Sequence, residues 1–358
     1  MTKVLIALSG GVDSTAAALI LQKQGYNLIS ACMSLLPPGK TMSCANQEDL
    51  NMAREVAANL GIEHHELNYQ DQFQERVIDE FVESYEAGFT PNPCVICNKR
   101  MKFDLLFDAA KKLGAEYIAT GHYVRKDYDE TSGRYLLKKA LDQKKDQSYV
   151  LYSLSQEQLA QSLFPLGEMS KDEARELAKE AGLKNYNKAD SQDICFIPDG
   201  DYVGFLEKHR GASYPPGNFV DKQGKILGRH HGLVGYTVGQ RKGLGISHSE
   251  PLYVSKLDPL KNEIVLVEKR DLYSAGLIAD RFNLIAYEKM AKDTLVYASC
   301  RYQEKPTAAK AEVMEGGLLK LSFLDPRKAV APGQSVVLYD GDIVVGGGRI
   351  RESLSPEN

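Results

Sequence analysis

The N-terminal segment joins a short apolar run to a helical pattern through two adjacent glycines. Residues 4–8 (VLIAL) form the apolar run, and the string SGGVDS at 9–14 follows directly. A continuous apolar run of this length is typical of a strand that is buried on both faces of a sheet. Residues 13–24 then carry apolar side chains at helical spacing and end at Gly25. This strand–loop–helix unit predicts the first element of a parallel sheet with helices on its faces.

The same alternation continues through the first half of the chain. The patterns predict strands at 26–35, 62–69 and 116–120, and helices at 46–60, 71–85 and 100–113. Residues 124–145 predict a hairpin, and residues 155–182 read as helical, with a capping box that begins at Ser170. Strands that are separated by helices of this length imply a doubly covered parallel sheet.

The pattern changes near residue 200, where glycines and prolines multiply, and short strands with tight turns follow from about 250. The turns at 258–259, 315–317 and 340–341 predict hairpins and a small C-terminal barrel. A length of 358 residues suggests about two or three domains. We expect an α/β protein with a Rossmann-like catalytic domain at 1–200 and a central adaptor domain at 201–262, with a helical contribution from about 162–183. A C-terminal β-barrel is expected at 263–358.

The string at 9–14 has the properties of a phosphate-binding loop. Its glycines allow a sharp turn and a close approach to a ligand, and the N–H groups at the start of the next helix favour an anion. The alternative is a simple strand-to-helix turn with a Ser or Asp cap. Asp13 fits either a helix cap or a ligand of Mg²⁺. The string lacks the Gly-Lys-Ser/Thr of a Walker A loop and resembles the PP-loop of ATP pyrophosphatases, which cleave ATP between the α and β phosphates.

The cysteines predict a protein of the cytoplasm. Six cysteines in 358 residues are too sparse for a secreted disulfide scaffold. The apolar run at 4–8 is shorter than the core of about 7–15 residues that a signal peptide needs, or the ~20 residues of a membrane span. We therefore expect a cytoplasmic protein with no membrane association, whose thiols are available for chemistry.

A C-x-x-C pair follows two prolines, in the segment TPNPCVICNKRMKF at 90–103. We expect a helix to begin near Asn98, so that its dipole and the nearby Lys99 favour the thiolate of Cys97. Such a pair indicates a metal or cluster site, a redox pair or a nucleophile, and two buried structural thiols are the alternative. Cys195 gains a chemical role only if it faces Cys97. The remaining three cysteines are interpreted as structural: Cys32, Cys44 and Cys300.

The charge distribution predicts a local basic face. A net charge of −4 excludes binding of nucleic acid through bulk positive charge. Residues 222–249 nevertheless carry five basic and no acidic residues, namely Lys222, Lys225, Arg229, Arg241 and Lys242. This stretch predicts a phosphate-binding face, and a solvated loop is the alternative. The adjacent His230 and His231 have no partners at metal-ligand spacing, so a metal is not predicted there.

Taken together, the motifs resemble the bacterial tRNA-specific 2-thiouridylase (MnmA) family of the PP-loop superfamily, over essentially the whole chain. The segments that carry the resemblance are SGGVDS (9–14), Met33 in the next strand, TPNPCVICNKRMKF (90–103), ATGHY (119–123), KDQSYVL (145–151), DSQDICFI (190–197), GRHHGLVGYTVGQRKGLGI (228–246) and APGQSVVLYDGD (331–342).

The resemblance implies an ATP- and Mg²⁺-dependent enzyme that adenylates the C2 oxygen of the wobble uridine (U34) in the tRNAs for Lys, Glu and Gln. Sulfur then replaces the activated oxygen. It implies that Cys97 is the nucleophile, that Cys195 carries a persulfide, and that the two form a transient disulfide. A sulfur relay that starts from a cysteine desulfurase is the implied donor. These steps suit the residues, because a persulfide is a strong nucleophile and a second thiol can release the product.

The resemblance also implies two sets of binding residues. The implied ATP-binding residues are Ala7, Leu8, Ser9, Gly10, Gly11, Val12, Asp13, Ser14, Met33 and Gly121. The implied tRNA-binding residues are Asn92, Pro93, Cys94, His122, Lys145, Asp146, Gln147, Arg301, Tyr302 and Gln334.

Cys94 departs from the family pattern, in which an aspartate stands at this position and is proposed as a general base. Either Cys94 is a bystander or a thiolate base, or it binds an iron–sulfur cluster together with Cys97 and Cys195. Two other functions remain open at this stage. Another PP-loop ligase would need no cysteines, and a non-catalytic tRNA- or cluster-binding protein would release no pyrophosphate.

Overall fold

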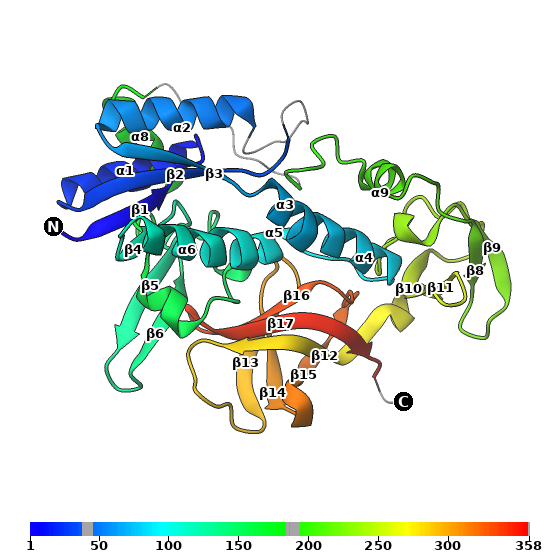
Figure 1. Ribbon diagram of the computed structural model, residues 1–358. Coiled ribbons are helices and arrows are strands. Elements are labelled where there is room, and N and C mark those ends of the chain that lie inside the picture. The colour runs from blue at the N-terminus through cyan, green and yellow to red at the C-terminus, as the bar shows by residue number, and fades with distance from the viewer. Residues whose placement is uncertain (38–45, 184–185, 187–193, 357–358) are drawn as a thin grey trace.

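The computed structural model describes residues 1–37, 46–183, 186 and 194–356 (Figure 1). The N-terminal part of the chain is built on a parallel sheet with the strand order β3-β2-β1-β4-β7. Its strands are β1 (Lys3–Ala7), β2 (Asn27–Ser34), β3 (Glu63–Asn68), β4 (Tyr117–Ala119) and β7 (Ser162–Leu163). The expected parallel α/β sheet at the N-terminus is confirmed.

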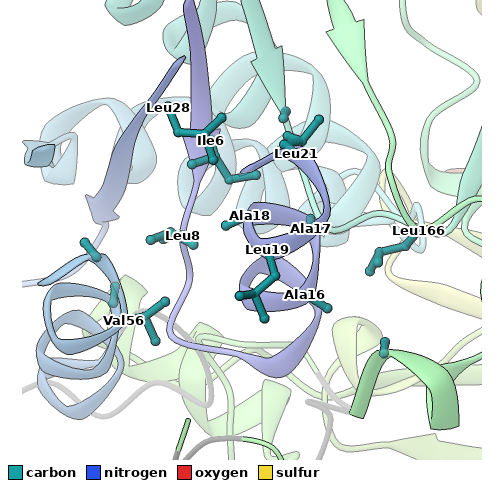
Figure 2. Packing of buried hydrophobic residues seen from close by; sticks show 14 of the residues in the cluster. Ile6, Leu8, Ala16, Ala17, Ala18, Leu19, Leu21, Leu28, Val56 and Leu166 are labelled. Atoms are coloured by element: carbon teal, nitrogen blue, oxygen red, sulfur yellow. The ribbon is translucent and has the colours of Figure 1, made fainter. Parts of the chain in front are cut away.

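Helices cover both faces of this sheet because successive side chains of a strand point to opposite sides. Ile6 and Leu8 pack against α1 (Val12–Lys23) and α2 (Gln47–Leu60) (Figure 2), and α8 (Lys171–Glu180) joins the same cluster by packing on α1. Leu5 points the other way and packs against α6 (Asp104–Lys112). Each fully buried side chain of this size contributes about 1.5–3 kcal/mol to the free energy of folding.

Two long helical segments lie between β3 and β4, and each contains a π-helical stretch. The first consists of α3 (Gln70–Phe73), η1 (Gln74–Asp79) and α4 (Glu80–Glu86), and the second of α5 (Pro93–Ile96), η2 (Cys97–Phe103) and α6. Stretches of π-helix are frequent at functional sites. The two segments pack together around a cluster of aromatic side chains that includes Phe73 and Phe81.

Residues 155–182 differ from the continuous helical stretch that the sequence predicts. After η3 (Ser148–Val150) and α7 (Gln156–Ala160), strand β7 adds to the parallel sheet through Ile118↔Ser162, and only then does α8 begin. β7 pairs with β4 and α8 packs on α1, so residues 162–180 lie against the parallel sheet, and the expected helical contribution to the central domain stays a prediction. A strand of two residues is too short to leave a periodic signal in the sequence.

The central part of the chain forms a second sheet with the order β10-β11-β8-β9. Its elements are α9 (Tyr202–Arg210), β8 (Gly217–Val220), β9 (Ile226–His230), η5 (Leu233–Gly235), β10 (Leu252–Asp258) and β11 (Glu263–Glu268). β11 pairs with both β10 and β8, so residues 263–268 belong to this sheet and not to the C-terminal barrel. The exact ends of the other domains remain predictions.

The C-terminal part is an antiparallel barrel that closes where β12 pairs with β17. Its elements are η6 (Lys269–Leu272), β12 (Tyr273–Leu284), β13 (Thr294–Ser299), β14 (Thr307–Val313), η7 (Glu315–Gly317), β15 (Leu319–Lys328), β16 (Ser335–Asp340) and β17 (Ile343–Leu354). The predicted barrel and its hairpins are confirmed. Among the residues that the structure describes, none belongs to a helix long and apolar enough to cross a membrane.

A hairpin of the N-terminal part joins the barrel to the parallel sheet. Its strands β5 (Val124–Asp129) and β6 (Arg134–Lys139) are those that the sequence predicts. β6 pairs with β17 through Ile343↔Lys138, and the Arg134 guanidinium donates to the backbone oxygen of Ile285 at 2.8 Å. The hairpin that follows β4 of the parallel sheet is therefore joined to the barrel by strand pairing and by a side-chain hydrogen bond.

Candidate active site

The loop after β1 is shaped by close packing against helix α2. Gly10 has a φ of +73°, and a Cβ atom at this position would lie 2.4 Å from the backbone oxygen of Asp49. The N-cap residue of α1 is Gly11, which has no side chain to occupy the N–H groups of the first turn. The Ser14 hydroxyl donates to the Gly11 oxygen and accepts from the Ser9 N–H at 3.1 Å. The loop therefore has the compact form and the helix start that bind phosphate.

The loop lies at the point where the strand order of the sheet reverses, between β1 and β4. Ligands of open α/β sheets bind at this position, at the carboxyl ends of the strands. Gly121 follows β4, and a Cβ there would lie 2.6 Å from the Ser14 nitrogen and 2.7 Å from the Asp13 carbonyl carbon. The two predicted nucleotide-binding segments are thus in direct backbone contact.

Asp13 is held by two side chains that the sequence analysis did not select. Its carboxylate accepts hydrogen bonds from the Lys171 ammonium at 2.7 and 2.8 Å and from the Tyr123 hydroxyl at 2.7 Å. The expected helix-capping role is wrong, because Gly11 occupies the cap position. A carboxylate whose two oxygens both face an ammonium fits Mg²⁺ binding poorly, since the cation would have to displace Lys171.

The remaining predicted nucleotide-binding residues surround the carboxyl ends of β1 and β2. Ala7 ends β1, and the Leu8 N–H donates to the Ala31 oxygen at 2.9 Å, while the Leu8 side chain is buried in the core. Val12 is buried likewise, and Met33 is half-buried near the end of β2. Leu8 and Val12 can thus offer a ligand only their backbone atoms.

The helix that carries the C-x-x-C pair begins earlier than the sequence predicts. Asn92 is the N-cap residue and Pro93 is the first helical residue, so the helix starts at Pro93 and not near Asn98. Proline is favoured at this position because the missing N–H is not needed there. Cys94 consequently lies exposed in the first turn, and Cys97 lies one turn further, at the start of the π-helical stretch. The helix dipole, which was expected to favour the thiolate of Cys97, therefore favours the thiolate of Cys94 instead.

Cys97 and Cys195 contact the same aromatic cluster. Both are half-buried and pack against the group that contains Phe81 and Phe196. The ring of Phe196, the residue after Cys195, lies 5.3 Å edge-to-face from that of Phe81. The fold therefore brings these two sequence-distant cysteines to one region. Residues 190–193 of the DSQDICFI motif lie outside the described residues.

The cysteines interpreted as structural are buried where the structure describes them. Burial raises the pKa of Cys32 to about 11, with a smaller contribution from Glu66, and raises that of Cys300 to about 12, with a smaller contribution from Glu304. Thiols with such pKa values are poor nucleophiles near neutral pH. Cys44 lies outside the described residues. Neither Cys32 nor Cys300 forms a disulfide bond.

The C-terminal barrel holds the loop that precedes Cys94. The Thr90 N–H donates to the Pro332 oxygen at 2.8 Å, and the Gln334 side-chain amide donates to the Thr90 oxygen at 3.0 Å. Gly333 fits closely, since a Cβ there would lie 2.6 Å from the Thr90 nitrogen. The predicted tRNA-binding residue Gln334 therefore also positions the start of the cysteine helix.

Several predicted tRNA-binding residues are engaged within the protein. His122 is buried, its Nδ1 lies 2.9 Å from the Thr120 hydroxyl, and burial lowers its pKa well below the usual value. The Gln147 side-chain oxygen accepts from the Tyr123 N–H at 2.9 Å. The Asp146 carboxylate accepts from the Ser148 hydroxyl at 2.7 Å, and burial raises its pKa. In this structure these three side chains stabilise the segments 120–123 and 146–148 through hydrogen bonds within the protein.

Tyr302 and Arg301 are exposed, and Lys145 is half-buried. Tyr302 is partly exposed, and its hydroxyl donates to the backbone oxygen of Asp146 at 3.1 Å. The pKa of Tyr302 is raised first by burial and then by Asp146, and the Cys94 thiol adds to this shift. The exposed Arg301 donates to the Ala329 oxygen at 2.8 Å. Tyr302 therefore places an aromatic ring of the barrel in the neighbourhood of Cys94.

Lys171, Tyr123 and Thr90 are the site residues that the sequence reasoning missed. Tyr123 and Thr90 lie inside motifs that carry the family resemblance, and these motifs are the signal that could have identified them. Lys171 follows the capping-box serine Ser170, a position that predicts a solvated residue, yet its side chain is buried. Its pairing with Asp13 spans 158 positions of sequence and leaves no local signal.

The basic stretch 222–249 contains β9 and η5, and the loop that follows them carries Arg241 and Lys242. Arg241 and Lys242 are exposed, and Arg241 lines a hollow of about 590 Å³ together with residues 243–252. His230 is buried, its Nε2 lies 3.2 Å from the Asn262 oxygen, and its Nδ1 accepts from the Gly232 N–H at 3.2 Å. Since both ring nitrogens have hydrogen-bond partners, His230 has a structural role in the central part.

The fold and the site together define the class of protein to which this chain belongs. A parallel α/β sheet with a glycine-rich, phosphate-shaped loop at its switch point is characteristic of nucleotide-binding domains, and here the same domain carries two thiols on one aromatic cluster. The chain is thus a PP-loop protein with two appended β-domains.

Comparison of the chain with protein-family models and with similar proteins identifies its family within this class. Residues 2–199 match the tRNA methyl transferase HUP domain, residues 203–268 its PRC-barrel domain, and residues 274–350 the aminomethyltransferase beta-barrel domain. The chain is 45% identical over 356 residues to the tRNA-specific 2-thiouridylase MnmA of Clostridioides difficile, covering 98% of this chain and 99% of that protein. It is 46% identical over 358 residues to tRNA-specific 2-thiouridylase MnmA 2 of Caldanaerobacter subterraneus, covering 98% of each chain. The chain belongs to the tRNA-specific 2-thiouridylase family.

Proposed function

We propose that this protein replaces the C2 oxygen of the wobble uridine in tRNA by sulfur, with ATP as the activating substrate. The observation that carries the proposal is the combination of a phosphate-shaped loop with two thiols, Cys97 and Cys195, on one aromatic cluster. The tRNAs for Lys, Glu and Gln are the proposed substrates, and the cytoplasm is the proposed location. A cysteine desulfurase relay is the proposed sulfur source.

In the first step the C2 oxygen of the uridine attacks the α-phosphate of ATP, and pyrophosphate leaves. The backbone N–H groups at the start of α1 stabilise the charge that develops on the phosphates. Adenylation is needed because a carbonyl oxygen is a poor leaving group, whereas AMP is a good one. The target base has to leave the anticodon stack to reach the loop, and Tyr302 offers a ring on which an extruded base can stack.

In the second step the terminal sulfur of a Cys195 persulfide attacks C2, and AMP leaves. The tRNA is then joined to Cys195 through an S–S bond. The Cys97 thiolate attacks the Cys195 sulfur, so that the 2-thiouridine leaves and a Cys97–Cys195 disulfide forms. A thiol reductant from the sulfur relay returns this disulfide to two thiols. Their half-burial on a shared cluster supports this exchange, which needs the two side chains to meet.

The experiment that tests the proposal is mass spectrometry of tRNA nucleosides after reaction with ATP, Mg²⁺ and a persulfide donor, namely a cysteine desulfurase supplied with free cysteine. We expect 2-thiouridine from the unmodified chain, at least a hundredfold less from Cys97→Ser under persulfide-donor conditions, and the same loss from Cys195→Ser. Cys300→Ser is the matched control and should keep its activity, because Cys300 is buried in the barrel core. Activity of both site variants equal to that of the control would favour another PP-loop ligase.

Cys94 is tested in the same assay. Under the persulfide mechanism the anaerobically purified protein contains no stoichiometric iron or acid-labile sulfide and is fully active. Stoichiometric iron that is lost in Cys94→Ala, together with loss of thiolation, would replace the persulfide mechanism by a cluster-dependent one.

We also propose that the basic loop around Arg241 and Lys242 binds tRNA phosphates. Both side chains are exposed, and they line or flank the hollow of the central part. Binding through phosphates weakens steeply as salt rises, and each contact that is removed reduces the slope by about one. The double variant Arg241→Gln/Lys242→Gln should weaken the binding of all three tRNAs to the same extent. Binding that does not depend on salt would contradict this.

A further inference from the structure

A cysteine, a histidine and a glutamate meet between the parallel sheet and helix α2, away from the residues assigned to thiolation. β2 and β3 run parallel in a register that places Ser30 beside His64 and Cys32 beside Glu66. Because alternate residues share one face of a sheet, all four side chains point to the same side. One ligand atom each of Cys32, His64 and Glu66 lies within 4.8 Å of the others, and no other set of this kind occurs among the described residues.

The hydrogen bonds of Ser30 determine which nitrogen of His64 is protonated. The Ser30 hydroxyl donates its single hydrogen to the backbone carbonyl oxygen of Glu63 at 3.0 Å. Its contact of 2.9 Å with His64 Nδ1 must then be one in which Nδ1–H is the donor. The lone pair of Nε2 is thereby left facing the Cys32 sulfur, 3.4 Å away.

This is the arrangement in which metal-binding histidines are found. They present one nitrogen to the metal and donate the other N–H to a fixed acceptor. We propose that Cys32, His64 and Glu66 bind a zinc-type divalent cation through Sγ, Nε2 and a carboxylate oxygen, with water as a fourth ligand. Sulfur, imidazole and carboxylate ligands in a four-coordinate site suit Zn²⁺.

Binding requires an exchange of a proton for the cation. The Cys32 S–H bond breaks, its proton passes to solvent, and a sulfur–metal bond forms without any change of oxidation state. Burial raises the pKa of Cys32 to about 11, so the thiol is protonated in the metal-free protein. His64 is already neutral, because burial lowers its pKa.

Arg54 of α2 competes with the cation. Its guanidinium Nε donates to Glu66 Oε1 at 3.0 Å, and a second nitrogen forms an ion pair with the same oxygen. The other carboxylate oxygen of Glu66 is the one that can turn to the cation. A positive charge this close opposes a second one, so replacing Arg54 by a neutral residue of similar length should strengthen metal binding.

The test uses the full chain with Cys94, Cys97 and Cys195 replaced by serine, so that the thiols of the proposed active site cannot bind the added metal. This choice also makes the result independent of thiolation. Titration with Co²⁺ should give one bound ion per chain, a thiolate-to-cobalt absorption band, and displacement by Zn²⁺. Zn²⁺ should also raise the midpoint of thermal unfolding, because it binds only the folded chain.

Variants in that background decide whether these three residues are the ligands. Cys32→Ala should remove the thiolate band, and His64→Ala should weaken binding at least tenfold. Arg54→Met should tighten binding several-fold. Cys300→Ala is the matched control, another buried thiol, and should bind as the parent does. A parent chain that binds no Co²⁺, or a band that survives in Cys32→Ala, overturns the proposal, and the parent titration decides this even where a variant fails to fold.

Discussion

The Lys171 ammonium contacts both carboxylate oxygens of Asp13, at 2.7 and 2.8 Å, and thereby ties helix α8 to the first turn of α1. The Lys171 side chain is only 5% exposed, whereas that of Asp13 is 32% exposed. The Tyr123 hydroxyl completes the arrangement from the segment after β4. Three segments that surround the nucleotide loop are therefore joined through one carboxylate.

Replacing Lys171 by methionine should destabilise the protein markedly. The variant keeps the apolar stem but leaves the Asp13 charge without its cation, and breaking a buried pair costs about 3–5 kcal/mol. Because water reaches Asp13, we expect a smaller loss, about 2 kcal/mol, in the free energy of unfolding measured with urea. Lys179→Met is the matched control in the same helix. It removes an exposed pair with Glu176 and should cost under about 0.5 kcal/mol. Equal losses in the two variants would contradict this reading.

Gly10→Ala should impair ATP binding through a clash as well as through strain. Gly10 and Gly25 both have positive φ, +73° and +83°, but only at Gly10 would a Cβ meet another atom, the Asp49 oxygen at 2.4 Å. Gly25→Ala therefore measures the cost of the backbone conformation alone, about 1 kcal/mol. Gly10→Ala should additionally push the loop away from α2 and weaken ATP binding at least tenfold. Calorimetric titration with ATP compares the two variants, and equal affinities would refute the steric argument.

The fold could largely be predicted from the sequence, because strand–helix alternation and turn chemistry are local signals. The hairpin around Asp340 and Gly341 is an example that the structure confirms. The predictions that were wrong concern positions where the local sequence signal is weak and the tertiary structure decides the conformation. The helix start was expected near Asn98, but proline also starts helices, and the helix begins five positions earlier at Pro93, which changes the cysteine that lies in the first turn. The Asp13–Lys171 pair could not be predicted, because only the packing of α8 on α1 brings the two residues together.

Gln334→Glu should slow thiolation without impairing ATP binding. The Gln334 amide donates to the Thr90 oxygen at 3.0 Å, and a carboxylate of the same shape cannot donate and repels that oxygen. The loop before Cys94 would then lose one of its hydrogen bonds to the barrel and keep the one from the Thr90 N–H to the Pro332 oxygen. We expect a drop in kcat of at least tenfold and a loss of about 1–3 kcal/mol in the free energy of unfolding. Gln161→Glu makes the same change of charge at an exposed position and is the control. A kcat equal to that of the control would show that the contact does not position the loop.

Acid should destabilise the protein through His122. The ring is buried, and burial together with the nearby Lys102 charge holds its pKa well below the usual value of about 6.5. Below pH 6.5 the unfolded chain binds a proton at this residue and the folded chain does not. The free energy of unfolding therefore falls as pH falls, by up to about 1.4 kcal/mol per pH unit from this site, and the effect is absent above the unfolded pKa. Urea unfolding at pH 7, 6 and 5 measures the slope. His122→Gln should reduce it, whereas His248→Gln, at an exposed position, should leave it unchanged. The slope that remains in His122→Gln should come partly from His64 and His230, whose pKa values burial also lowers. A slope that is the same in His122→Gln and the unmodified chain would show that His122 is not protonated on unfolding in this range.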